Sequence, residues 1–141
     1  MYEYRATVLK VIDGDTVDVD IDLGFGIWLR NERIRVAGID TPESRTSDRE
    51  EKKFGLAAKA RVKELLKEEN LILKTEIDRS GEDAKGKFGR ILGDFVLGNT
   101  TLGQTLISEG HAVPYHGQSK EDVQAAHMAN RLRLLKEGVV K

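Results

Sequence analysis

The chain has 141 residues, of which 39% are apolar and 33% charged, a balance that argues against a disordered protein. Lys and Arg total 23 against 24 Asp and Glu, for a net charge of −1, so a polyanion would have to be bound by a local patch. The sequence has no cysteine, which excludes disulfides and thiolate metal sites. No apolar run approaches the about 18 residues of a membrane span, so no membrane partner is expected. We expect a single domain over residues 1–141.

The N-terminal segment "MYEYRATVLK" lacks the charged start and apolar middle of a secretory signal. We therefore expect a cytoplasmic protein, secreted only if the sequence is a processed form.

Residues 4–22 predict a β-hairpin, because a strand over 4–11 is followed by the turn pattern Asp13-Gly14-Asp15 and then by strict alternation. The apolar face of the second strand is Val17, Val19 and Ile21, and the acidic face is Asp18, Asp20 and Asp22. The same alternation turns Asp15 toward the core, where a carboxylate is costly unless it is hydrogen-bonded or lies beside a cation. Asp-Gly is also typical of an ordinary hairpin turn, so this motif alone does not establish a site.

Residues 23–26 predict a loop, and residues 27–39 predict one or two strands with an irregularity at Asn31-Glu32. Alternation turns Ile34, Val36, Gly38 and Asp40 to one inner face and Arg35 to the other. The segment Asp40-Thr41-Pro42-Glu43 then ends the strand with two acids, although it is also compatible with an ordinary loop.

The Ser-x-x-Glu pattern of residues 47–50 is typical of a capping box and predicts a long amphipathic helix over about 48–68. Residues 71–77 and 88–97 predict two further strands, separated by a polar, glycine-containing loop over 78–87 that we expect to be mobile.

A short helix capped by Asn99-Thr100 should turn Leu102 and Leu106 inward and end at Gly110. A last helix should begin at Ser119, with apolar residues in three-four spacing at Ala125, Met128, Leu132 and Leu135. Five short strands with a helix after the third favour an α+β fold, namely a five-stranded Greek-key OB-fold β-barrel with about three α-helices.

Taken together, hard oxygen ligands, an extra carboxylate and two guanidinium groups are what phosphodiester hydrolysis requires. Carboxylates bind Ca²⁺ or Mg²⁺, a further carboxylate can deprotonate water, and guanidinium forks match phosphate oxygens. The histidines His111, His116 and His127 lack any standard ligand spacing, and we expect each to be a surface or half-buried residue. No Ser-His-Asp triad can be argued either.

Four motifs, "VIDGDTV", "RIRVAGIDTPE", "KFGRILG" and "LISEGHAVPY", resemble in their order and spacing the thermonuclease family, whose type member is staphylococcal nuclease. The resemblance covers about residues 4–136 and implies the OB-fold barrel. It implies Ca²⁺ as cofactor, bound by the carboxylates of Asp15 and Asp40 and the carbonyl of Thr41. It also implies Glu43 as the water-activating carboxylate and Arg35 and Arg90 as the phosphate clamp.

The resemblance further implies substrate contacts from Lys87, Phe88 and Tyr115. Phe88 departs from the family, which has Tyr there, and the loop over 78–87 is longer than in the type member. The implied function is a calcium-dependent nuclease that cuts DNA and RNA and leaves 3′-phosphate and 5′-hydroxyl ends. We expect a monomer that acts on single-stranded DNA and RNA and on frayed duplex DNA.

The alternative is a catalytically inactive nuclease-like OB-fold module that binds single-stranded nucleic acid or protein. Degenerate members of the family lack the acids or arginines, whereas all of them are present here, which favours the enzyme.

Overall fold

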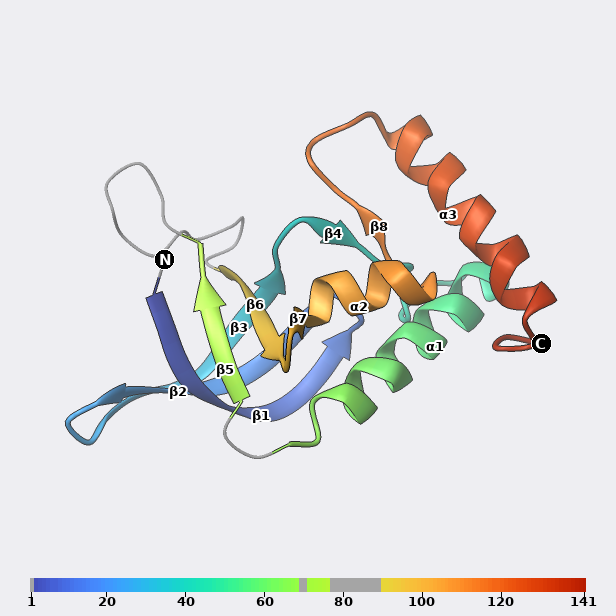
Figure 1. Cartoon of the computed structure of the whole chain (residues 1–141). Coiled ribbons are helices and arrows are strands. Elements are labelled where there is room, and N and C mark those ends of the chain that lie inside the picture. Colours follow the sequence, from blue (N-terminus) through green and yellow to red (C-terminus); the bar gives the residue numbers. More distant parts are fainter. Residues whose placement is uncertain (1, 69–70, 77–89) are drawn as a thin grey trace.

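The computed structural model describes residues 2–68, 71–76 and 90–141, and it shows a five-stranded barrel with the helices gathered on one side of it (Figure 1). Its strands are β1 (Tyr2–Asp13), β2 (Thr16–Gly24), β3 (Ile27–Val36), β5 (Leu71–Thr75) and β6 (Ile91–Leu97). They pair in the order β3-β2-β1-β5-β6, and a parallel pairing between β3 and β6 closes the barrel. With three helices added, the architecture confirms the predicted α+β OB-fold.

The barrel core follows the predicted alternation. Val17, Val19 and Ile21 of β2 are at most 2% exposed, while the intervening aspartates are half-buried. Ile34 and Val36 of β3 are fully buried, as predicted. Because side chains alternate strictly along a strand, this pattern of apolar residues fixes which face of each strand lines the barrel.

A β-bulge interrupts β3 where the sequence predicted an irregularity. Asn31 has a φ of 54°, and between the pairs Val19↔Glu32 and Ile21↔Leu29 one residue of β2 faces two of β3. That residue is Asp20, whose carboxylate accepts hydrogen bonds from Asn31 N at 2.9 Å and Arg30 Nη1 at 3.0 Å. The bond from the Asn31 backbone lowers the pKa of Asp20 below its usual value. The Asp20 carboxylate thus accepts a hydrogen bond from the Asn31 backbone N–H, which the bulge leaves without a partner in the strand pairing.

Helix α1 (Arg49–Leu65) packs beside β1. It begins one residue later than the capping-box pattern suggested. Its N-cap is Asp48, whose side chain accepts from the backbone N–H groups of Glu50 and Glu51. The prediction of Ser47 as the cap was wrong, because the Asp48 carboxylate already accepts the N–H that the Ser47 hydroxyl would have needed.

Helix α2 (Leu102–Glu109) buries Leu102 and Leu106 fully and ends at Gly110, which adopts a left-handed conformation with φ 83°, as predicted. Its N-cap is Thr101 rather than the predicted Asn99-Thr100 pair, because β7 (Thr100–Thr101) first pairs with β6.

The remaining elements are a two-stranded sheet of β4 (Ile39–Asp40) and β8 (Val113–Pro114), which the sequence did not predict, and helix α3 (Lys120–Lys136). In Figure 1 β4 and β8 lie between the barrel and α3. Ser119 caps α3, as predicted. None of the helices in the described part of the chain is long and apolar enough to cross a membrane.

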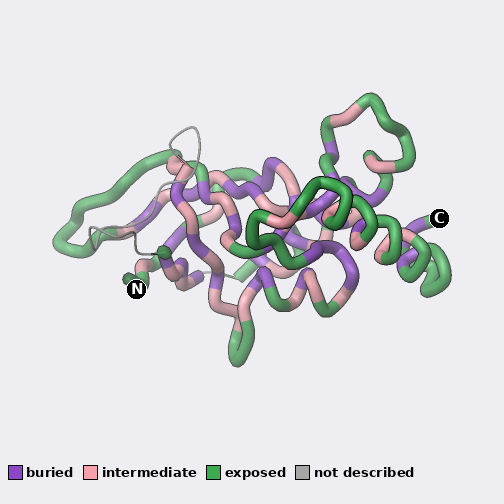
Figure 2. The backbone as a smooth tube through the Cα atoms, turned by 90° about the horizontal axis from the view of Figure 1, so that it is seen from above, coloured by how far each residue is buried: buried purple, intermediate pink, exposed green. Residues whose placement is uncertain are grey.

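The orientation of α3 differs from the one that its apolar spacing suggests. Met128, Leu132 and Leu135 are 47–71% exposed, and much of the helix is solvent-facing in Figure 2. The buried positions are instead His127 and Leu134. The reason is that hydrogen bonds from His127, Asn130 and Arg133 hold the opposite side of the helix against the rest of the protein.

His111 was predicted as a surface or half-buried residue, and the structure shows it only 6% exposed. It follows Gly110, and its backbone N–H returns to Leu106 O at 2.9 Å, which folds the chain back onto α2. Its Nδ1 is buried without a hydrogen-bond partner in the described part of the chain. Burial lowers the pKa of His111 from its usual 6.5, and the nearby Glu109 carboxylate offsets this only in part.

Because the pKa of His111 is lower in the folded than in the unfolded chain, the unfolded chain takes up the proton first as the pH falls. Stability should therefore decrease below about pH 6.5, and the loss should level off once the pH passes the folded pKa. We expect His111→Gln to reduce the fall in Tm between about pH 8 and pH 5. His116→Gln, at an exposed histidine, is the control and should keep the parent's profile; identical profiles for all three proteins would contradict this role of His111.

Candidate functional site

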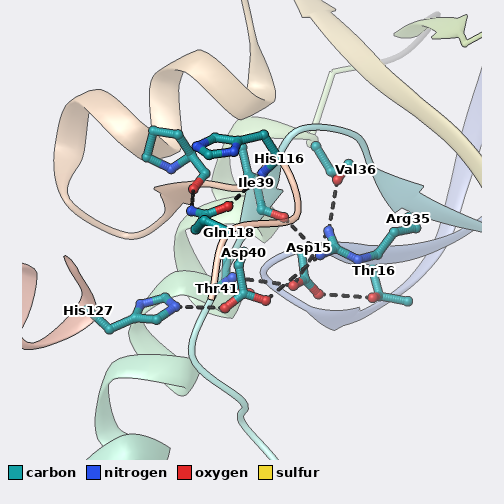
Figure 3. Close-up of polar contacts among 11 residues, drawn as sticks. Asp15, Thr16, Arg35, Val36, Ile39, Asp40, Thr41, His116, Gln118 and His127 are labelled. Atoms are coloured by element: carbon teal, nitrogen blue, oxygen red, sulfur yellow. Dashed lines mark hydrogen bonds and ion pairs between the residues drawn. The ribbon is translucent and has the colours of Figure 1, made fainter. Parts of the chain in front are cut away.

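The Arg35 side chain closes the turn that follows β3. Its Nη1 donates to Val36 O at 2.8 Å and its Nη2 to Ile39 O at 2.8 Å (Figure 3). The chain reverses between these carbonyls at Gly38, whose φ of 77° favours glycine. Alternation alone had placed Arg35 on the face opposite the acids. The turn overrides it, because both carbonyls draw the guanidinium round to the side of Asp40.

Two acids flank this guanidinium. Asp15 Oδ2 lies 3.6 Å from Nη1 and Asp40 Oδ1 lies 3.8 Å from Nη2, and the side chains of Arg35 and Asp15 are only 15% and 14% exposed. One partly buried cation thus balances two converging carboxylates, which would otherwise repel each other. Gly38, which was predicted to face inward with Asp40, is exposed because the strand has already ended in the turn.

Asp15 occupies the hairpin turn between β1 and β2, so the predicted turn is confirmed. Its carboxylate accepts from Thr16 Oγ1 at 3.0 Å and from Thr41 N at 3.3 Å. At Gly14, an added Cβ would lie 2.9 Å from Ala58 Cβ and 3.0 Å from Thr41 Cγ2. Glycine therefore lets the turn approach the segment that carries Thr41.

Asp40 is held by segments remote in sequence. It pairs with Val113 across the β4–β8 sheet. A hydrogen bond from Tyr115 N to Gly38 O at 2.8 Å joins the residues that follow β8 to the turn before β4. Its Oδ2 lies 2.7 Å from His127 Nε2, a contact drawn in Figure 3. His127 is 7% exposed, so its prediction as a surface or half-buried residue was wrong. No local pattern links positions 40 and 127, and only the three-four spacing of His127 with Asn130 and Leu134 hinted at an inward side chain.

The donor set fits a hard divalent cation with open coordination positions. In the part of the chain that the structure describes, no three His, Asp or Glu side chains gather closely enough to hold a metal by themselves. The two carboxylates of Asp15 and Asp40 nevertheless converge near Thr41, whose Oγ1 is buried without a hydrogen-bond partner. Ca²⁺ and Mg²⁺ accept such oxygen ligands and complete their coordination with water or phosphate oxygens.

The other predicted residues border one open groove of about 670 Å³ that Arg35, Asp40 and Thr41 also line. Glu43 and Tyr115 reach it with exposed side chains, and Arg90 with a half-buried one. Seven of the predicted site residues therefore lie in or beside one groove, Asp15 through its contacts with Arg35 and Thr41. Lys87 and Phe88 lie outside the described residues.

Gly55 of α1, for which no role was predicted, lies against the peptide that carries Glu43. A Cβ at this position would lie 2.2 Å from the carbonyl oxygen of Glu43 and 2.6 Å from Ser44 N. The helix thus packs directly on the peptide that carries Glu43. The sequence did contain a hint, since glycine inside a helix costs up to about 1 kcal/mol relative to alanine and needs a reason.

Comparison with known proteins identifies the family of the chain. Residues 33–137 match the family model described as "Staphylococcal nuclease homologue". The thermonuclease of Staphylococcus intermedius is 35% identical over 105 residues, which is 74% of this chain and 56% of that protein. The thermonuclease of Staphylococcus hyicus is 31% identical over 110 residues, 78% of this chain and 59% of that protein. The SPbeta prophage-derived endonuclease YokF of Bacillus subtilis is 30% identical over 129 residues, 85% of this chain and 40% of that protein.

This chain therefore spans little more than half the length of the two staphylococcal thermonucleases. The family model, in contrast, covers most of this chain, including Arg35, Asp40, Glu43 and Arg90. The chain belongs to the family of staphylococcal nuclease homologues.

Proposed function

We propose that the chain is a calcium-dependent nuclease that hydrolyses phosphodiester bonds of DNA and RNA. The observation that carries the proposal is the position of the Arg35 guanidinium between the carboxylates of Asp15 and Asp40, beside a groove that Glu43 and Arg90 also border. Hard oxygen ligands, a free carboxylate and guanidinium groups in one open groove suit an anionic phosphodiester. Membership of the nuclease family and the names of its relatives support the same chemistry.

Asp15, Asp40 and the carbonyl of Thr41 would hold Ca²⁺. The bound ion would supply positive charge that neutralises phosphate and lowers the pKa of a coordinated water. Glu43, which is exposed in the groove, would accept the proton of the attacking water. In-line attack on phosphorus would then break the bond to the 5′ oxygen, which would take a proton from solvent water, leaving a 3′-phosphate and a 5′-hydroxyl.

Arg35 and Arg90 would stabilise the charge that develops on the phosphoryl oxygens. The Arg35 guanidinium has N–H groups to spare for this purpose. It carries five N–H donors, and the hydrogen bonds to Val36 O and Ile39 O occupy two of them. Those two bonds orient the fork before substrate arrives, which reduces the ordering cost of binding.

Single-stranded and frayed substrates should suit the groove best, because a stacked duplex hides its bases while a single strand offers both phosphate and base. Tyr115 lies at the groove with 44% of its surface exposed and offers a ring on which a base could stack. The alternative of an inactive binding module shares the fold and the groove and differs in one respect, since it would not cut.

Glu43→Gln should separate catalysis from binding. The amide cannot accept the proton, so turnover should fall about a hundred- to ten-thousandfold while the affinity for a nucleoside bisphosphate changes little. Arg35→Lys should weaken that affinity as well, because an ammonium group cannot reproduce the two-pronged fork. Turnover on single-stranded DNA and calorimetric binding measure the two effects, with Arg49→Lys on the exposed start of α1 as a control. Parent-like turnover in a folded Glu43→Gln protein would refute the role of Glu43.

Calcium should bind weakly in the absence of nucleotide, with a Kd on the order of 0.1 to 1 mM, because the protein supplies only three oxygen ligands. Asp40→Ala should abolish the calorimetric signal, because it removes a carboxylate ligand, and nucleotide should tighten binding to the parent, since phosphate oxygens complete the coordination. A chelator should stop cleavage and added Ca²⁺ should restore it. Cleavage that persists unchanged in chelator would refute the calcium dependence.

Gly55→Ala should impair both stability and turnover. At an ordinary helix position this change would stabilise the fold by up to about 1 kcal/mol. Here the methyl group meets the Glu43 carbonyl, and overpacking of this kind costs about 1–3 kcal/mol or displaces the loop. Thermal unfolding and turnover measure the two effects, with Ala60→Gly on the exposed face of α1 as a control for helix propensity. A more stable Gly55→Ala protein with full turnover would show that this close approach does not position Glu43.

A further inference from the structure

We infer that His127 is a positioning residue that holds the Asp40 carboxylate in the orientation needed to bind the metal. The inference rests on the proposed function, because Asp40 is a metal ligand only if the site binds Ca²⁺. It assigns a role to α3, which otherwise has few contacts with the barrel in the described part of the chain.

The contact itself is short and well shielded. His127 Nε2 lies 2.7 Å from Asp40 Oδ2, and the His127 side chain is only 9% exposed. The ionised carboxylate can only accept, so Nε2 is the donor whether or not the ring carries a second proton. The other oxygen, Oδ1, is the one that faces Arg35, at 3.8 Å from Nη2. Oδ2 therefore accepts the hydrogen bond from His127, while Oδ1 remains on the side of Arg35 and Asp15, where a metal would bind.

The rest of α3 keeps the imidazole in place. Asn130 Nδ2 donates to Ala112 O at 3.2 Å, and Arg133 Nη2 donates to Ser108 O at 2.8 Å. One turn further along, Leu134 is 2% exposed in a small apolar cluster with Phe54 and Val140. His127, Asn130 and Leu134 follow three-four spacing, so one side of the helix is fixed against the body of the protein. The imidazole is thus attached to a rigid support.

Asp40 needs such support, because it lies in a two-residue strand and its side chain is 33% exposed. A carboxylate in that position can rotate about its terminal torsion, and metal binding would have to restrict this rotation. Outer partners that orient a metal ligand typically change metal affinity ten- to a hundredfold when they are removed. We therefore expect loss of the His127 donor to weaken Ca²⁺ binding about tenfold.

The test is calorimetric titration of Ca²⁺ into the full chain without nucleotide, for the parent and four variants. His127→Phe and His127→Ala remove the donor, the first while keeping a ring of similar size. His127→Gln keeps an N–H donor of similar reach. His116→Phe is the matched control, since His116 is an exposed histidine whose side chain has no role in the proposed mechanism. Thermal unfolding without metal identifies which variants are folded.

The expected result is a Ca²⁺ affinity about tenfold weaker for the Phe and Ala variants, near the parent value for the Gln variant, and unchanged for His116→Phe. A purely structural role would lower Tm and leave the affinity of the folded variants unchanged, which would overturn the inference. An equal loss in the Gln variant would also overturn it, because packing and not the hydrogen bond would then be responsible.

The same titration, together with a DNA cleavage assay on the parent, distinguishes this inference from the proposed function. A parent that binds Ca²⁺ and cuts DNA, with variants of unchanged affinity, overturns only the role of His127. A parent that shows no Ca²⁺ binding overturns the proposed calcium dependence and, with it, the positioning role of His127.

Discussion

The site depends on one charge arrangement, in which the Arg35 guanidinium lies between the carboxylates of Asp15 and Asp40. Both carboxylates converge on this one guanidinium, and without a cation between them their negative charges would repel each other. The cation in turn is held by the carbonyls of Val36 and Ile39, which the turn after β3 directs inward. Barrel closure fixes the start of this turn, since β3 pairs with β6 up to Val36. The position of the positive charge at the site therefore depends on the closure of the barrel.

The helices hold the groups around this centre by close approach and by hydrogen bonding. Helix α1 packs Gly55 against the peptide that carries Glu43, with no room for a methyl group between them. Helix α3 brings His127 to Asp40, and the short β4–β8 sheet holds Asp40 beside Val113. Asp40 and the peptide of Glu43 are thus each held by an element remote in sequence, which makes their positions more rigid than isolated loops would allow.

Much of the barrel and several helix ends could be predicted from local rules. The alternation of β2, the irregularity in β3, the cap at Ser119 and the end of α2 at Gly110 each depend on residues a few positions apart. Errors arose where two local signals competed or where the contact was remote. Asp48 displaced Ser47 as a cap, and the exposed apolar residues of α3 suggested an orientation that the bonds of Asn130 and Arg133 oppose.

The sequence by itself determined the strand faces and, through its motifs, the family and the set of acids and arginines to consider. These features are local, because side-chain alternation, capping and motif spacing are properties of neighbouring residues. Only the tertiary structure decided that Arg35 turns toward the acids, that Gly55 contacts the Glu43 peptide and that His127 donates to Asp40. The physical reason is that these contacts join separate elements, so they exist only once the barrel has closed and the helices have packed against it.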